Sequence, residues 1–148
     1  MSRPPLTRPP EMSDDDAELM SAAAALLDRV YETGRHEVVA AMRLTDGTVR
    51  LGVHVDGSAR RSAVCAEGVA AGNVFAYAAE TGAAAVVVSC VSVLRRPSGT
   101  RHLIEPCGVC AELLSDYWPV ARVWVTRGDE IVAVTATELL PAKRSRTW

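Results

Sequence analysis

Three of the four cysteines occupy positions from which their thiolates can bind one metal ion. Cys107 and Cys110 form a Cys-x-x-Cys pair directly after Pro106, and Cys65 stands upstream at the start of an alanine-rich segment. At the start of a helix, such a pair places both thiols on the same side, and free backbone N–H groups stabilise the thiolate form that a metal requires. If the two helix starts meet in the fold, these cysteines predict a zinc site.

Three protein ligands leave one position of a tetrahedral zinc ion open, which is typical of catalytic zinc. A water molecule there can be acidified to a pKa of about 7 and become a nucleophile. Glu67 follows Cys65 on the same predicted first turn, so its carboxylate is the candidate for moving the proton. Two alternatives are a structural zinc ion, with Cys90 or His102 as fourth ligand, and a set of metal-free buried thiols. The pattern favours a packed strand position for Cys90 and a loop for His102.

The elements that position these residues follow from hydrophobic periodicity and turn residues. Ser13 and Asp16 resemble a capping box at the first helix, and Asp46-Gly47 is typical of a tight hairpin. We predict helices at residues 13–34, 64–80 and 107–117, a helical turn at 137–140, strands at 38–44, 48–55, 84–94, 121–126 and 130–135, and an exposed loop at 95–105. This order predicts a three-layer α/β/α sandwich with a mixed five-stranded sheet.

The chain length of 148 residues is sufficient for one hydrophobic core, so neither disulfides nor metal are needed for folding. Any metal ion must therefore be explained by function. We expect one domain at residues 13–141 and a C-terminal tail at 142–148. Residues 1–12 contain four prolines and few apolar residues, which predicts a disordered leader.

Charge and hydropathy exclude several kinds of partner. The 16 Lys and Arg residues against 18 Asp and Glu residues leave a net charge of −2, which argues against nucleic acid. The longest apolar run, residues 82–88, is far shorter than the roughly 20 residues of a transmembrane helix. The first residues lack the apolar stretch of a secretory signal, so we expect a cytoplasmic protein without a membrane partner.

Residues 65–67 (Cys-Ala-Glu) and 106–110 (Pro-Cys-Gly-Val-Cys) together resemble the signature of the cytidine deaminase superfamily. The resemblance covers residues 15–141. The three-thiolate version is similar to the small homotetrameric cytidine deaminases and the blasticidin S deaminases. This resemblance implies one Zn²⁺ per subunit, bound by Cys65, Cys107 and Cys110, and it implies that Glu67 is the catalytic residue.

The same resemblance implies an activity. The expected reaction is hydrolytic deamination of the 4-amino group of cytidine, deoxycytidine or a similar small molecule in pyrimidine salvage, giving the uracil product and ammonia. The expected partner is a small-molecule nucleoside, and the expected assembly is a homotetramer. One alternative is a deaminase of a nucleoside antibiotic similar to blasticidin S, or of another aminated heterocycle. An alternative from another class is a catalytically inactive, zinc-stabilised binding protein.

The resemblance also implies substrate-binding positions. Where nucleoside-specific members carry Asn-x-Glu for the ribose hydroxyls, this chain has His54-Val55-Asp56. An aspartate can accept bonds from the same hydroxyls, and a histidine can donate one. His36 stands where the family usually has a Phe or Tyr that packs on the base, and Ala66 is the middle residue of the first motif. A solvated strand end is the alternative for His54 and Asp56.

Two arginines that are common in the family are absent. Ala111 and Glu112 follow the second motif, and Gly68 follows Glu67. Because three thiolates leave a zinc ion with a net negative charge, we expect another cation nearby. Our candidates are Arg60, Arg61, Arg95 and Arg96. In the relatives a C-terminal aromatic residue reaches a neighbouring subunit's pocket, but the favoured interpretation of Trp148 here is a tail residue.

Overall fold

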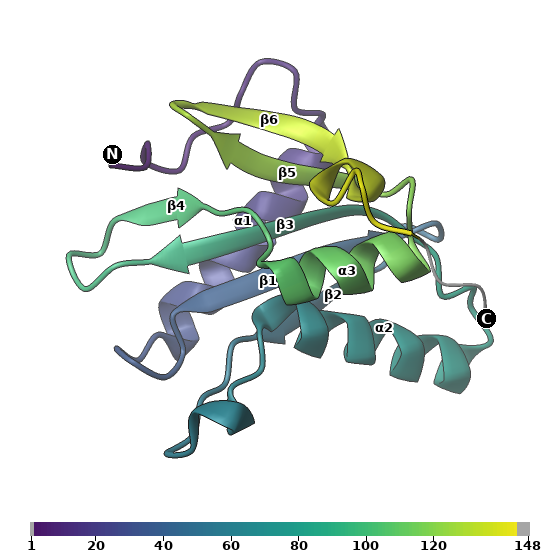
Figure 1. Ribbon diagram of the computed structural model, residues 1–148, viewed down its shortest axis with the longest axis horizontal. Helices are drawn as coiled ribbons and strands as arrows, with labels where there is room; N and C mark the ends of the chain where they lie inside the picture. Colours follow the sequence, from purple (N-terminus) through teal and green to yellow (C-terminus); the bar gives the residue numbers. More distant parts are fainter. Residues whose placement is uncertain (1, 145–148) are drawn as a thin grey trace.

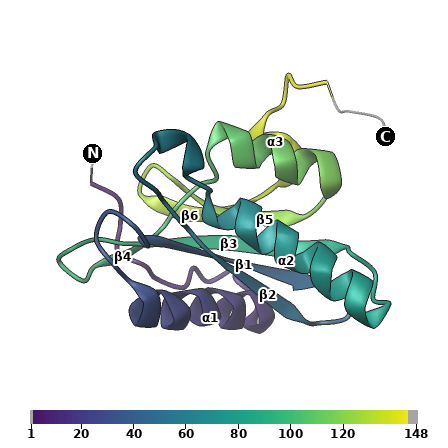
Figure 2. The ribbon, with the colours of Figure 1, turned by 90° about the horizontal axis from the view of Figure 1, so that it is seen from below.

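A mixed β-sheet with helices on both faces forms the framework of the protein (Figure 1). The computed structural model describes residues 2–144, whose elements are α1 (Asp14–Val30), β1 (Val38–Leu44), β2 (Val49–Val53), η1 (Arg60–Ser62), α2 (Ala66–Thr81), β3 (Val87–Arg95), β4 (Arg101–Leu103), α3 (Gly108–Tyr117), β5 (Arg122–Arg127), β6 (Glu130–Thr135) and η2 (Ala136–Leu139). The strand order is β2-β1-β3-β5-β6, and β4 pairs with β3 outside this path. Helix α1 covers one face, and α2 and α3 cover the other (Figure 2). The predicted three-layer sandwich is confirmed.

Alternation along the central strands explains the two cores. In β1, Val39 and Ala41 pack in the cluster beneath α1, whereas Ala40 and Met42 pack in the cluster beneath α2 and α3. Successive side chains of a strand point to opposite faces, so a strand that is covered on both sides reads as a continuous apolar run.

The sixth strand lies in the segment that the sequence predicted as a loop. Residues 95–105 contain β4, which pairs antiparallel with β3, and His102 lies in this strand opposite Leu94. The strand is too short for a periodic pattern, and its pairing depends on β3 rather than on its own residues. The predicted first helix also ends earlier, at Val30 rather than at residue 34.

The sheet topology brings the starts of α2 and α3 to the same side. Strands β2 and β3 both pair antiparallel with β1, so they run in the same direction. Helix α2 starts beyond the end of β2, and the β4 hairpin returns the chain from β3 to the start of α3. Helix α2 also packs closely on β2 at Gly52, where a side chain would collide with the backbone of Ala66 and Ala70.

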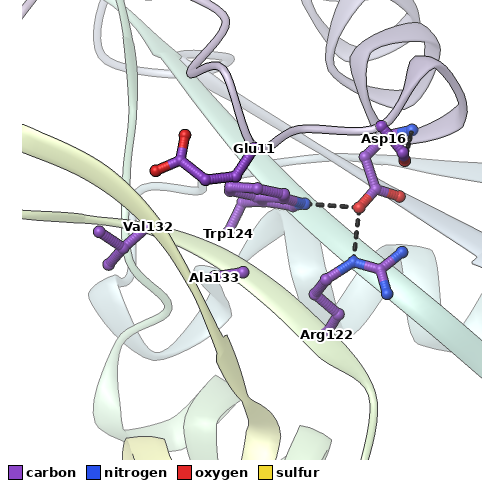
Figure 3. A pocket seen from close by; sticks show the side chains of 7 residues that line it. Glu11, Asp16, Arg122, Trp124, Val132 and Ala133 are labelled. Carbon is purple, nitrogen blue, oxygen red and sulfur yellow. Dashed lines mark hydrogen bonds and ion pairs between the residues drawn. The ribbon is translucent and has the colours of Figure 1, made fainter.

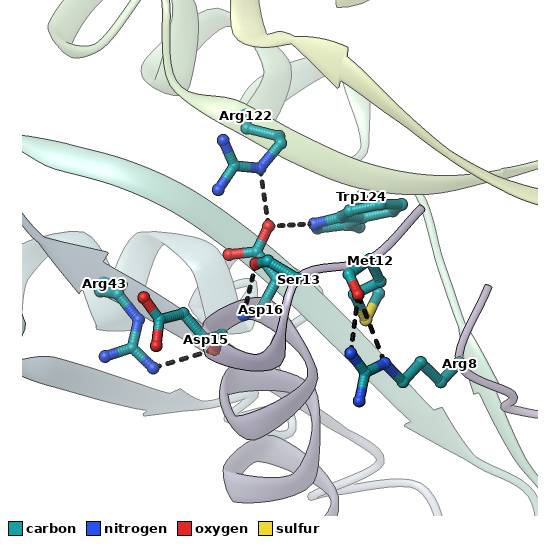
Figure 4. Close-up of polar contacts among 8 residues, drawn as sticks. All are labelled: Arg8, Met12, Ser13, Asp15, Asp16, Arg43, Arg122 and Trp124. Carbon is teal, nitrogen blue, oxygen red and sulfur yellow. Dashed lines mark hydrogen bonds and ion pairs between the residues drawn. The ribbon is translucent and has the colours of Figure 1, made fainter. Parts of the chain in front are cut away.

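Asp16 links α1 to β5 (Figure 4). Its backbone N–H donates to Ser13 Oγ at 3.2 Å, as the predicted capping box requires. Its carboxylate does not return to Ser13. Instead, the side chain is 1% exposed, and Oδ2 accepts hydrogen bonds from Arg122 Nε at 2.6 Å and Trp124 Nε1 at 2.7 Å. These residues line a hollow of about 490 Å³ on the α1 face of the sheet (Figure 3).

The proline-rich leader has defined contacts in the structure, which differs from the expected disorder. The Leu6 N–H donates to Arg101 O at 2.8 Å, and Met12 is 2% exposed beneath α1. The composition of the leader does not indicate these contacts, because the partners, β4 and the core beneath α1, are formed by residues far along the chain.

The other end of the chain is described only as far as residue 144. Lys143, in the predicted tail, donates to the Asp116 carboxylate at 2.7 Å, whereas Trp148 lies outside the described residues. Within residues 2–144, no helix has the length and apolar character needed to cross a bilayer.

The Asp16 contacts predict a pH-dependent contribution to stability. Burial alone would raise the pKa of Asp16, but the hydrogen bonds from Arg122 and Trp124 outweigh it and lower this pKa. A carboxyl with a lowered folded-state pKa stabilises the fold above its unfolded-state pKa, and the benefit is lost as the pH falls through the folded-state pKa. We expect Asp16→Asn to reduce the free energy of unfolding by about 1–2 kcal/mol at pH 7.

Denaturant unfolding at several pH values tests this expectation. The difference between wild type and Asp16→Asn should shrink below about pH 4, the ordinary pKa of an aspartate. Asp15→Asn is the matched control, because Asp15 lies in the same helical turn and its side chain is exposed. A difference that stays constant down to acid pH would contradict the assigned role of the Asp16 charge.

Candidate metal and catalytic site

The sulfur atoms of Cys65, Cys107 and Cys110 come together, as predicted. All three lie within 4.8 Å of one another, and the Sγ atoms of Cys65 and Cys107 are 3.5 Å apart. A tetrahedral zinc ion with Zn–S bonds of about 2.3 Å separates its sulfur ligands by roughly 3.8 Å. The three cysteines are free thiols. The donor set therefore fits one thiophilic divalent ion such as Zn²⁺.

Local structure explains why these thiols meet. Cys65 and Cys107 are the N-cap residues of α2 and α3, so both side chains lie at helix starts. The Val64 N–H donates to Val55 O at 2.9 Å, which returns the chain to the end of β2 just before α2. The Ile104 N–H donates to the carbonyl oxygen of residue 92 in β3, which holds the segment before α3 against the sheet.

The thiols differ in their readiness to ionise. Burial and the contact with Cys107 raise the pKa of Cys65, and burial together with the charge of Glu67 raises the pKa of Cys110. Burial also opposes ionisation of Cys107, but the nearby backbone N–H groups of Cys110 and Val109 and the contact with Cys65 outweigh it and lower the pKa of Cys107. A bound cation offsets both burial and mutual repulsion, so metal binding and thiol ionisation are coupled.

A cavity of about 250 Å³ opens beside the thiols, and its lining residues are Glu37, Val38, His54, Cys65, Ala66, Glu67, Ile104, Glu105 and Cys107. The two residues considered as a fourth ligand lie elsewhere. Cys90 is fully buried within β3, and His102 Nδ1 donates to Pro4 O at 2.8 Å. Among residues 2–144, neither belongs to the thiol cluster. The described donor set therefore has three members, which is the pattern of a catalytic site.

Glu67 is 4% exposed and is held by a residue that sequence reasoning missed. Ser92, a buried residue of β3, donates its hydroxyl to Glu67 Oε1 at 2.8 Å. The other oxygen, Oε2, has no hydrogen-bond partner among the described residues. The only signal in the sequence was a serine within an apolar strand, which by itself does not identify a partner.

The predicted substrate-binding residues divide into two groups. His54 and Ala66 line the cavity. His36 and Asp56 are not among its lining residues: His36 Nδ1 donates to His54 O at 2.9 Å, and Asp56 Oδ1 accepts from the Gly57 N–H at 2.9 Å. His54 Nε2 lies 4.0 Å from Asp56 Oδ2, so Asp56 lies beside a cavity-lining residue.

The expected cation near the thiols is not Arg95. This guanidinium pairs with Asp28 of α1 and lies 4.6 Å from the centre of the Tyr31 ring, on the opposite face of the sheet. The remaining candidates, Arg60, Arg61 and Arg96, form no side-chain hydrogen bond or ion pair with the residues that the structure describes. The hypothesis stays untested for these three.

Metal analysis of cysteine variants tests the cluster. We expect wild type and Cys90→Ala to purify with about one zinc ion per chain and Cys107→Ala with almost none. Cys90 is the matched control, because it is a buried cysteine outside the cluster. Metal content is normalised to folded protein measured by circular dichroism. Equal zinc content in Cys107→Ala and wild type would contradict the proposed ligand set.

Comparison with known proteins agrees with this site. The family model described as "Cytidine and deoxycytidylate deaminase zinc-binding region" matches residues 13–136. The chain is 31% identical over 140 residues to the blasticidin-S deaminase of Bacillus cereus, covering 91% of this chain and 96% of that protein.

Solved structures show the same fold. The cytidine deaminase from Burkholderia pseudomallei has a TM-score of 0.68 and 26% identity, covering 88% of this chain and 98% of that chain. The cytidine deaminase from Bacillus anthracis has a TM-score of 0.70 and 23% identity, covering 86% of this chain and 88% of that chain. The match to the family over most of the chain, together with three clustered thiols beside a buried glutamate, leads to one conclusion: the chain belongs to the cytidine and deoxycytidylate deaminase family.

Proposed function

We propose that this protein is a zinc-dependent aminohydrolase that removes the 4-amino group of cytidine, deoxycytidine or a related small nucleoside. The observation that carries the proposal is the placement of a buried carboxylate, Glu67, in the same cavity as a cluster of three thiols. Membership of a deaminase family supports the reaction class.

The proposed cofactor is one Zn²⁺ per chain, held by Cys65, Cys107 and Cys110. When bound, zinc lowers the pKa of a water molecule so that it is a nucleophile near neutral pH. In the overall reaction the water oxygen bonds to C4 of the cytosine ring and the C4–N bond breaks. One proton of the water goes to ring N3 and the other leaves with the amino group as ammonia.

Glu67 has the properties needed to move both protons. Ser92 holds Oε1, which fixes the carboxylate, and Oε2 stays available to accept and donate a proton. Glu67 is almost fully buried and lines the cavity, so its free oxygen is accessible mainly from the cavity. A carboxylate that is fixed in this way reduces the reorganisation required during proton transfer.

Substrate positioning is proposed for the four residues that resemblance suggested. His54 and Ala66 contact the substrate directly from the cavity wall, and the His54 imidazole offers a donor to a sugar hydroxyl. Asp56 orients His54 by lying beside its imidazole, and His36 orients it by donating to its backbone carbonyl oxygen.

Similarity to a blasticidin-S deaminase supports a second candidate substrate, a nucleoside antibiotic with an aminated pyrimidine ring. The replacement of the family's Asn-x-Glu by residues 54–56 (His-Val-Asp) agrees with a substrate whose sugar differs from ribose.

We also propose that the protein is an oligomer, with a homotetramer as the expected state. Exposed apolar side chains of α2, of α3 and of the segment after α3 support association: Phe75 is 37%, Val109 78% and Val120 85% exposed. Apolar surface of this kind is typical of contact regions between proteins.

A panel of substrates with a Glu67→Gln control tests the proposed reaction. We expect wild type to convert at least one of cytidine, deoxycytidine, cytosine and blasticidin S, followed by ultraviolet absorbance and ammonia release. Glu67→Gln should retain zinc and lose activity by at least about a thousandfold, because an amide cannot carry the proton. Turnover by Glu67→Gln would overturn the assignment of Glu67. Zinc-loaded wild type without turnover of any compound would favour a binding protein.

The Ser92 contact predicts a selective loss of kcat. Removing a hydrogen bond to a buried carboxylate should reduce kcat of Ser92→Ala about tenfold, with little change in KM or zinc content. Ser89→Ala is the matched control, because Ser89 is a buried serine of β3 that does not contact Glu67. Ser92→Thr retains the hydroxyl and should recover most of the lost activity. Equal kcat values for Ser92→Ala and Ser89→Ala would contradict the positioning role.

A further inference from the structure

The leader, residues 2–12, runs along β4 toward the cavity that contains the thiols. The Leu6 N–H donates to Arg101 O at 2.8 Å, and the His102 side chain donates to Pro4 O at 2.8 Å. These two contacts join Pro4 and Leu6 of the leader to two neighbouring residues of β4. The residue that precedes them, Arg3, is thereby carried to the cavity rim.

Arg3 and Glu105 form an ion pair at two points. Arg3 Nη1 donates to Glu105 Oε2 at 2.6 Å, and Nη2 donates to the other carboxylate oxygen. Paired donors of this kind restrict both side chains more than a single contact does. Glu105 lines the cavity and lies two residues before the metal ligand Cys107. The pair therefore links the leader to the wall of the site.

The pair also sets the charge of the cavity rim. Three carboxylates line the cavity, those of Glu37, Glu67 and Glu105. Among residues 2–144, Arg3 is the only Arg or Lys that forms an ion pair with any of them. Without Arg3, the rim would carry an additional uncompensated negative charge. Without Glu105, the charge of Arg3 would lose its carboxylate partner at the rim.

Both partners are accessible to an incoming ligand. Their side chains are 32% and 42% exposed, so the pair is neither sealed in the core nor free in solvent. Partly exposed charges still act on a ligand a few ångströms away, although salt weakens the effect.

We propose that Arg3 is a specificity-determining residue: by neutralising Glu105 it sets the balance with which the cavity binds cationic and anionic forms of a nucleoside ligand. The proposal rests on the proposed deaminase function and refines its substrate class. It assigns a functional role to the leader, which the sequence alone presented as disordered.

Charged analogues of one substrate test the proposal. The probes are 5′-amino-5′-deoxycytidine, which is cationic, and cytidine 5′-monophosphate, which is anionic. The inhibition constant of each probe is measured for wild type and for each variant at low ionic strength. Relative to wild type, Arg3→Met should bind the cation about two- to fivefold more tightly and the anion more weakly by a similar factor. Glu105→Gln should produce the opposite pair of changes.

Arg8→Met is the matched control. Arg8 is also an arginine of the leader, but it binds Met12 O and the Asp14 carboxylate away from the cavity. This variant should leave both inhibition constants at their wild-type values. The exchanged pair Arg3→Glu with Glu105→Arg should restore wild-type discrimination.

Opposite shifts for the two probes separate a charge effect from simple loosening of the rim. Loosening would change both inhibition constants in the same direction, and that result would overturn the proposal. Variants that behave like Arg8→Met would overturn it as well.

Hydrogen exchange at the Leu6 amide gives a readout that does not depend on activity. Exchange should accelerate in Arg3→Met and stay slow in Arg8→Met, and equal rates would contradict the leader contact. If wild type turns over no substrate, the deaminase proposal fails, and the exchange data still decide whether Arg3 holds the leader.

Discussion

The approach of two helix N-termini over strand β3 is the constraint on which the rest of the site depends. A metal ion with three thiolate ligands requires sulfur atoms less than about 4 Å apart, and no single helix supplies all three here. Strand direction, the β4 hairpin and the close packing of α2 on Gly52 bring the helix starts together. Their backbone N–H groups then favour the ionised thiol at Cys107. The capacity of the three thiols to bind one metal ion therefore depends on how the fold places the starts of α2 and α3.

The same arrangement concentrates negative charge, and the fold compensates for it locally. Burial of Cys110, together with the neighbouring charge of Glu67, raises the pKa of this thiol. The Ser92 hydroxyl satisfies one oxygen of Glu67 and leaves the other for chemistry. At the rim, Arg3 offsets the charge of Glu105. On the opposite face, Asp16 is buried with Arg122 and Trp124, which secures α1 against β5.

The long elements and the thiol cluster were predictable because their signals are local. Hydrophobic periodicity located the helices and the long strands, and the spacing of Cys107 and Cys110 identified one side of the site. A strand as short as β4 has no periodic pattern in the sequence. The prolines and the low apolar content of the leader predict disorder and carry no sign of its contact with β4. Of the four arginines considered for the expected cation, Arg95 instead pairs with Asp28 on the far face.

Sequence by itself therefore indicated the family, the long helices and strands, the three thiols and the glutamate proposed as catalytic, because motif spacing and periodicity are patterns within a few residues. Tertiary structure alone decided which side chains support them. Ser92 meets Glu67, and Arg3 meets Glu105, only because the sheet and the β4 hairpin bring distant segments into contact. Hydrogen bonds and ion pairs act over a few ångströms, so partners far apart in the chain leave no pattern that a single sequence can show.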